Sequence, residues 1–133
     1  MKKDIPFIPV NGVSVAVARK KNLTDYEWYV YIINKNQFPI TNILISSKGY
    51  GEKEGEVQKT SILRHLIEEM EPQSSAIIEP IDPAVFHLFN EYWVSYYVDG
   101  QIYDKKFIFV PDSISDNNLI KISHLELEGV LHE

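Results

Sequence analysis

The choice of aliphatic side chains constrains this chain more than any other feature of its sequence. Its 133 residues include 17 Ile and 11 Val, but only 9 Leu and 4 Ala. Branching at Cβ restricts a side chain in a helix and suits a pleated sheet, so this balance favours strands over helices. With 44% hydrophobic and 24% charged residues, the chain is apolar enough to fold, and its length fits one domain. We therefore expect an all-β protein.

The alternation of apolar and polar side chains places the strands. Val13, Val15 and Val17 alternate with small residues, as in a half-buried strand, and the Asp-Gly pair at 99–100 is a strong hairpin signal because both positions of a primed turn need positive φ. We expect strands over 12–20, 27–34, 42–49, 60–66, 75–81, 91–98 and 101–110, a polar connection over 49–59 and a helical turn over 68–72. About seven short strands favour an immunoglobulin-like two-sheet antiparallel β-sandwich, with a closed barrel as the alternative fold.

The C-terminal segment differs in composition from the rest of the chain. Residues 111–133 carry five acids and one base, a net charge of −4, interleaved with Leu, Ile and Val. A segment this apolar is not expected to stay free in solvent. We therefore expect a sandwich domain over 1–110 and a short C-terminal arm over 111–133 that packs on the same domain or on a partner subunit.

Charge and cysteine content exclude several classes of protein. The net charge is −6 and there is no Cys, which excludes disulfides and thiolate chemistry and disfavours binding of nucleic acid through clustered cations. No apolar run approaches the ~20 residues of a membrane-spanning helix, and Pro6 and Pro9 interrupt the N-terminal stretch that an export signal would need. We expect a cytoplasmic protein with no nucleic-acid or membrane partner.

The sequence contains no motif that indicates catalysis. Its four His have no metal-binding spacing, and no serine lies in a GxSxG elbow, so we expect no metal and no cofactor. Arg64 and His65 are neighbours in an expected strand and should point to opposite faces. A pair of acids such as Glu79 and Glu91 fits a glycosidase, but any acidic chain offers such a pair. The chain is therefore expected not to be an enzyme.

The expected hairpin around residues 99–100 places an unusual set of side chains on one face. With a two-residue loop, Trp93 lies opposite Lys106, and Tyr97 lies opposite Ile102. The other face is more apolar and should belong to the core. Aromatic rings beside a cation are typical of protein interfaces. Trp93, Tyr97, Ile102 and Lys106 are thus the predicted partner- or ligand-binding residues, unless the C-terminal arm covers them.

Three segments carry a resemblance to a known family. They are SSKGYG at 46–51, EYWVSYY at 91–97 and YDKKFIF at 103–109. With these segments the chain resembles, over nearly its full length, a family of small proteins from Bacteroidetes-type bacteria to which no functional residues are assigned. Some members are labelled phenylalanyl-tRNA synthetase α subunit, and this label implies an ATP-dependent ligase.

The residues themselves favour a different class. A class II synthetase core holds ATP with motif arginines, whereas this chain has only Arg19 and Arg64. We expect a non-enzymatic protein-interaction or self-association module, either with a protein partner or as a homo-oligomer. One alternative is a small-ligand or carbohydrate-binding module that uses Tyr29, Tyr31, Trp93 and Tyr97 as its platform. The other is the synthetase-related protein that the family label suggests.

Overall fold

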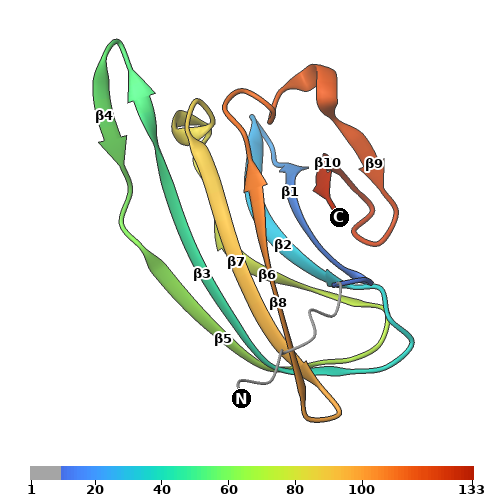
Figure 1. Cartoon of the computed structure of the whole chain (residues 1–133). Coiled ribbons are helices and arrows are strands. Elements are labelled where there is room, and N and C mark those ends of the chain that lie inside the picture. Colours follow the sequence, from blue (N-terminus) through green and yellow to red (C-terminus); the bar gives the residue numbers. More distant parts are fainter. Residues whose placement is uncertain (1–9) are drawn as a thin grey trace, which may run out of the picture.

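The computed structural model of the chain describes residues 10–133 and shows two antiparallel β-sheets packed face to face (Figure 1). Residues 1–9, on which part of the expectation about an export signal depends, lie outside the described residues. In chain order the elements are β1 (Val13–Lys21), β2 (Tyr26–Asn34), β3 (Ile40–Lys53), β4 (Glu56–Lys59), β5 (Leu63–Met70), β6 (Ser74–Pro80), the 3-10 helix η1 (Pro83–Val85), β7 (Phe89–Val98), β8 (Gln101–Phe109), the 3-10 helix η2 (Asp116–Asn118), β9 (Ile120–Ile122) and β10 (Leu127–His132).

The strands divide into two sheets of five. The first sheet has the order β6-β2-β1-β10-β9, and the second has the order β4-β3-β7-β8, with β5 also pairing with β3. β4 pairs with the C-terminal part of the long strand β3, and β5 pairs with its N-terminal part. The expected all-β class and two antiparallel sheets are confirmed. The described part of the chain holds ten strands instead of about seven, because β4, β9 and β10 add to the expected set.

The main core lies between the two sheets. Val13, Val15 and Val17 face it from β1, and Phe107, fully buried, faces it from β8. A smaller cluster covers the outer face of the first sheet, where Ala16 and Ala18 pack with side chains of the C-terminal arm. Both faces of β1 are therefore covered, which explains why the small alternating residues of this strand are buried as well as the valines.

The C-terminal arm is a structural part of the first sheet. β10 pairs with β1, and β9 pairs with β10. Gly129 lies opposite Ala18 in this pairing, and a Cβ atom at Gly129 would come within 2.4 Å of the Val17 carbonyl oxygen. Two acidic side chains of the arm form ion pairs with the rest of the domain. Glu128 lies 3.1 Å from Arg19, and Glu133 lies 2.8 Å from Lys35.

The expected connection over 49–59 was wrong, because β3 continues through it to Lys53. Gly49 is extended and closely approached by another segment. Its N–H donates to Thr60 Oγ1 at 2.7 Å, and a Cβ atom at Gly49 would lie 2.9 Å from the Thr60 methyl carbon. The turn comes later, at Glu54 and Gly55, where φ is +53° and +81°. Gly49 therefore marks a close approach of two segments, and only Gly55 marks the turn.

The helical turn expected over 68–72 was also wrong. β5 runs without interruption from Leu63 to Met70 and pairs with β3, with Ile43 opposite Ile67 and Leu44 opposite Leu66. The Glu-rich sequence of this segment has weak strand propensity. Pairing with β3 decides its conformation, which is the usual way in which tertiary contacts override a local preference.

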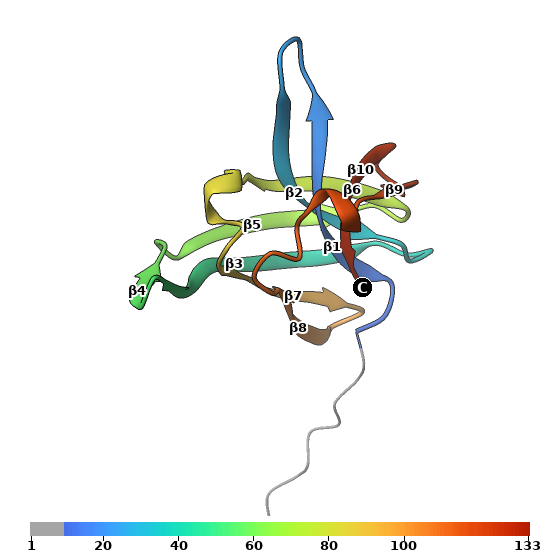
Figure 2. The ribbon, with the colours of Figure 1, turned by 90° about the horizontal axis from the view of Figure 1, so that it is seen from above.

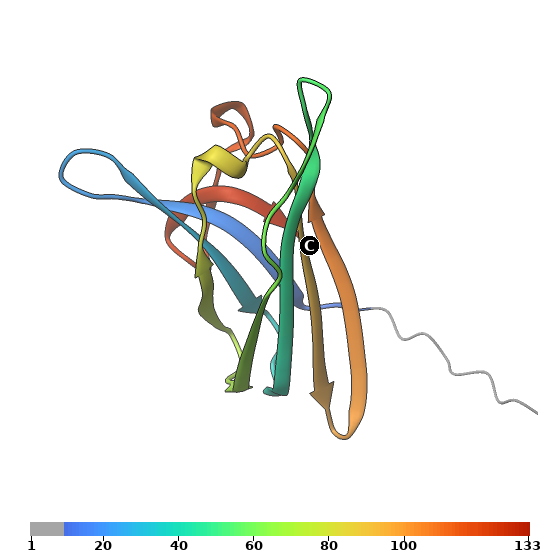
Figure 3. The ribbon, with the colours of Figure 1, turned by 90° about the vertical axis from the view of Figure 1, so that its left-hand side faces the viewer.

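Two hairpins extend beyond the packed layers. The β1–β2 hairpin projects away from the sandwich (Figure 2), and the β3–β4 hairpin extends past the end of the second sheet (Figure 3). Asn22 Oδ1 accepts hydrogen bonds from the N–H groups of Thr24 and Asp25, which orders the tip of the first hairpin around the fully exposed Leu23. Across residues 10–133, no helix has the length and apolar character needed to cross a bilayer.

Candidate functional site

The predicted site residues lie together on the outer face of the second sheet. The pairing of β7 with β8 confirms the expected register, with Trp93 opposite Lys106 and Tyr97 opposite Ile102. The side chains are open to solvent, with exposures of 46% for Trp93, 37% for Tyr97 and 50% for Ile102. Lys106 Nζ lies 4.9 Å from the centre of a Trp93 ring, in cation–π contact.

Two further apolar side chains extend this surface across the sheet. Leu44 on β3 and Leu66 on β5 are opposite one another in the register, and their exposures are 55% and 62%. Sequence reasoning missed both residues. Leu44 lies between two isoleucines and Leu66 precedes another, so the apolar pattern does not show which face either Leu occupies. We call the surface formed by Leu44, Leu66, Trp93, Tyr97 and Ile102 the apolar stripe; it crosses β5, β3, β7 and β8.

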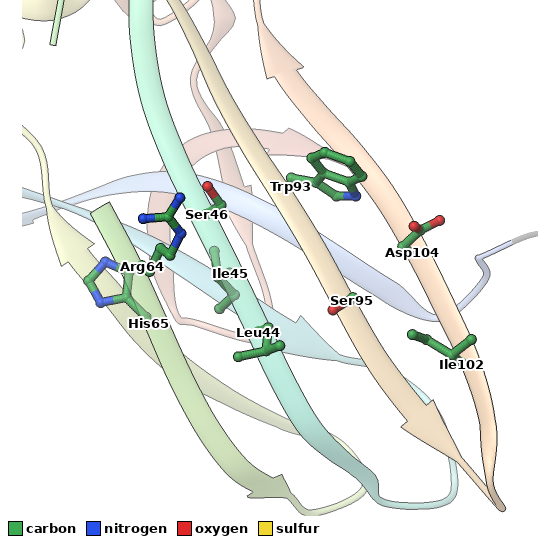
Figure 4. Close-up of a pocket in the computed structure, with 9 residues that line it drawn as sticks. All are labelled: Leu44, Ile45, Ser46, Arg64, His65, Trp93, Ser95, Ile102 and Asp104. Carbon is green, nitrogen blue, oxygen red and sulfur yellow. The ribbon is translucent and has the colours of Figure 1, made fainter. Parts of the chain in front are cut away.

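A shallow groove lies within the apolar stripe (Figure 4). It has a volume of about 340 Å³. Ser46 and Ser95 contribute short side chains beside larger ones, which leaves room at this point. Arg64 lies toward the β5 side of the groove, and Asp104 lies toward the β8 side. The groove therefore combines apolar walls with one positive and one negative side chain.

The C-terminal arm does not cover the apolar stripe. β9 and β10 belong to the first sheet, whereas Trp93 and its neighbours lie on the outer face of the second. The alternative in which the arm covers these residues is therefore excluded. The reason is that the apolar residues of the arm cover the outer face of the first sheet and complete its strand order.

The four-ring platform expected for a carbohydrate ligand is not formed. Tyr29 and Tyr31 lie on β2 of the first sheet, with ring centres 6.5 Å apart. Trp93 and Tyr97 lie on β7 of the second sheet. Tyr31 packs with the cluster on the outer face of the first sheet, so the two pairs of rings face away from each other on opposite sides of the sandwich.

A polar cluster around Glu79 lies between the two sheets. Glu79 Oε1 accepts a hydrogen bond from Ser47 Oγ at 2.8 Å and lies 2.7 Å from His65 Nε2, and Glu79 Oε2 accepts one from Tyr92 OH at 3.0 Å. Because a carboxylate only accepts, His65 carries its hydrogen on Nε2. These donors come from β3, β5 and β7, and the acceptor comes from β6. The cluster therefore connects the two sheets, and three of its residues, Ser47, Glu79 and Tyr92, line a cleft of about 370 Å³.

A β-bulge directs Glu79 into this position. The pairing of β2 with β6 shifts between Val30 and Tyr31, which leaves Ile78 without a direct partner. Ile78 is 6% exposed and packs in the core, while the side chain of the next residue, Glu79, is only 11% exposed. Strict alternation would send these neighbours to opposite faces, and the bulge turns both inward.

The geometry does not assemble the catalytic pairs that the sequence raised. Glu91 hydrogen-bonds to Tyr50 OH at 3.2 Å on the face of β7 opposite to Tyr92, so it does not share a pocket with Glu79. Arg64 is exposed while His65 contacts Glu79, which confirms their expected separation. Among residues 10–133 no group of three His, Asp or Glu is placed to hold a metal ion.

Ionisation of Tyr92 should make the fold sensitive to alkaline pH. Burial raises the pKa of Tyr92 above its ordinary value of 10.0, and the Glu79 carboxylate raises it further. An unfolded chain ionises this phenol near pH 10 while the folded chain keeps it neutral, so the unfolding free energy falls as pH rises above about 10. We expect this fall to be smaller for Tyr92→Phe, by up to about 1.4 kcal/mol per pH unit.

Urea denaturation between about pH 9 and pH 11.5 measures this difference. Tyr26→Phe removes one phenol from an exposed position and serves as the control. It should follow the wild-type pH dependence. The same slope for Tyr92→Phe and for the wild type would show that the buried phenol does not couple folding to pH.

Comparison with known proteins does not assign this chain to a family. The sequence matches no protein-family model, and no curated protein matches it at a significant level. The class is therefore defined by the fold, a two-sheet antiparallel β-sandwich, and by the apolar stripe on the outer face of its second sheet.

Proposed function

We propose that this chain is a non-enzymatic protein-interaction module built on an immunoglobulin-like β-sandwich, with the outer face of the second sheet as its contact surface. The observation that supports this function is the apolar stripe. Contiguous exposed apolar side chains rimmed by polar groups mark interaction sites in water-soluble domains. Here five large side chains, each exposed by 37% or more, follow one another across four strands.

The rim of the stripe supports the same function. Arg64, Glu68, Asp104 and Lys106 are exposed around the apolar residues. Trp, Tyr and Arg are the residue types that most often carry binding energy at protein interfaces. The stripe holds one Trp and one Tyr, and its rim holds one Arg. The polar rim would keep the free protein in solution while giving a partner directional contacts.

Affinity capture from the source cells tests this function. A Trp93→Ser, Ile102→Ser double variant removes two side chains of the stripe. We expect the wild type to retain specific proteins, its own untagged copies included, and we expect the double variant to lose them.

The matched control is Leu23→Ser with Val57→Ser, which removes two exposed apolar side chains, at 102% and 70% exposure, from the two projecting hairpins. It should retain what the wild type retains. Retention of the same proteins by the stripe variant would contradict the proposal. Thermal unfolding of both variants should stay close to that of the wild type, because exposed substitutions change stability little.

A further inference from the structure

Resting on the proposed function, we propose that the partner of the outer face is a second copy of this chain, packed with a twofold axis perpendicular to the strands. The exposed side chains form three rows that cross the sheet from β5 to β8. The first row is Arg64, Ser46, Trp93 and Lys106, and the second is Leu66, Leu44, Ser95 and Asp104. The third is Tyr97 and Ile102, with Glu68 on β5 offset from them by the register shift of β3 between Thr41 and Leu44. Glu68 follows Leu66 by two residues and therefore shares its face.

The twofold axis runs along the second row in this arrangement. Each strand then faces the same strand of the second molecule, which runs in the opposite direction. The first row of one molecule therefore meets the third row of the other. Arg64 meets Glu68 of the second copy, and Trp93 meets Tyr97 of the second copy. Leu66 and Leu44 meet their own counterparts near the axis. A twofold interface uses one surface twice. The β5 side is complementary in charge, because Arg64 meets Glu68 at two places, whereas on the β8 side Lys106 meets Ile102 and Asp104 meets its own counterpart.

The other face-to-face arrangement is unfavourable. An axis parallel to the strands would exchange β5 with β8. Arg64 would then face Lys106 of the second copy, and Leu66 would face Asp104. Like charges and a carboxylate against an apolar side chain both oppose association. The perpendicular axis also brings two like charges together, at Asp104, but it forms two Arg64–Glu68 contacts, whereas the parallel axis forms no contact between opposite charges. The balance of charge thus favours the perpendicular axis.

The charges on β5 are available for this contact. Across residues 10–133, neither Arg64 nor Glu68 takes part in an ion pair or in a side-chain hydrogen bond. Packed sheets cross at about 30°. Rows of the two molecules therefore stay opposite one another close to the axis. The long side chains of Arg64 and Glu68 can span the remaining offset at the sheet edge.

The size of the surface sets the expected strength. Four strands spaced by about 4.8 Å and three same-face rows spaced by about 6.8 Å cover roughly 400 Å² as a flat projection. This is smaller than the ~800 Å² per partner of a standard stable interface. We therefore expect a dimer with a dissociation constant in the micromolar range or above.

Sedimentation velocity of the purified protein over a concentration series, at low and at high salt, tests the proposal. The wild type should dimerise. Arg64→Glu and Glu68→Arg should each weaken dimerisation by about tenfold, because each change places like charges together twice in the dimer. The double variant with both changes should dimerise like the wild type.

An equimolar mixture of the two single variants gives the sharpest outcome. In the mixed dimer, two Glu of one molecule face two Arg of the other, so the mixture should associate although each variant alone does so weakly. Failure of this rescue, or single variants that keep the wild-type dissociation constant, would overturn the proposed axis. A wild type that stays monomeric at millimolar concentration would overturn the second copy as partner, while loss of captured proteins from the stripe variant would still support the outer face as a site for a different protein.

Discussion

Truncation of Phe107 to alanine is expected to lower the free energy of unfolding by about 3–5 kcal/mol. Phe107 is fully buried between the sheets and packs edge-to-face with the His132 ring, whose centre lies 5.3 Å away. Its removal leaves a cavity that strands anchored on both sides cannot close. Urea denaturation at neutral pH measures the loss.

The neighbouring residue on β8 provides the control for this prediction. Lys106 points to the outer face and contacts Trp93. Lys106→Ala and Trp93→Ala should each cost less than about 1 kcal/mol, because both side chains are largely solvent-exposed in the monomer. Losses as large as that of Phe107→Ala would contradict the assignment of the outer face to binding, since they would show that the fold itself depends on it.

Replacement of Glu79 by alanine is expected to cost about 3 kcal/mol of unfolding free energy. The change leaves the donors of Ser47, His65 and Tyr92 without their shared acceptor. A buried donor that loses its partner costs about 1 kcal/mol or more. Equilibrium denaturation measures the effect, and Tyr92→Phe, which removes one of the three donors, should cost about 1 kcal/mol.

Glu52→Ala provides a carboxylate control. Glu52 is exposed near the end of β3, so its loss should leave stability within about 0.5 kcal/mol of the wild type. A Glu79→Ala variant as stable as Glu52→Ala would contradict the cluster as a connection between the sheets. Such a result would leave Glu79 as an open polar group of the cleft, with its hydrogen bonds replaced by water.

The β7–β8 hairpin was the most predictable part of the fold. Asp99 and Gly100 both have positive φ, at +48° and +77°, as the primed turn requires. A two-residue loop leaves no freedom in the register of the strands beside it. For this reason the pairings of Trp93 with Lys106 and of Tyr97 with Ile102 could be predicted before any tertiary contact was known.

The neighbours of this hairpin could not be predicted in the same way. Leu44 and Leu66 complete the apolar stripe because β5, of which only the part up to Leu66 was expected to be a strand, pairs with β3. Glu79 enters the space between the sheets because of a bulge in β6. Neither event has a local sequence signal, since each depends on which strand lies beside the segment.

The sequence by itself determined the all-β class and the register of one hairpin, and it favoured a two-sheet antiparallel arrangement over a closed barrel. These properties follow from β-branched composition, alternation and turn stereochemistry, which act over a few residues. The tertiary structure alone decided that the C-terminal arm completes the first sheet and leaves the apolar stripe exposed on the second. Strand order joins residues far apart in the chain, and the free energy of their pairing depends on packing that no local pattern encodes.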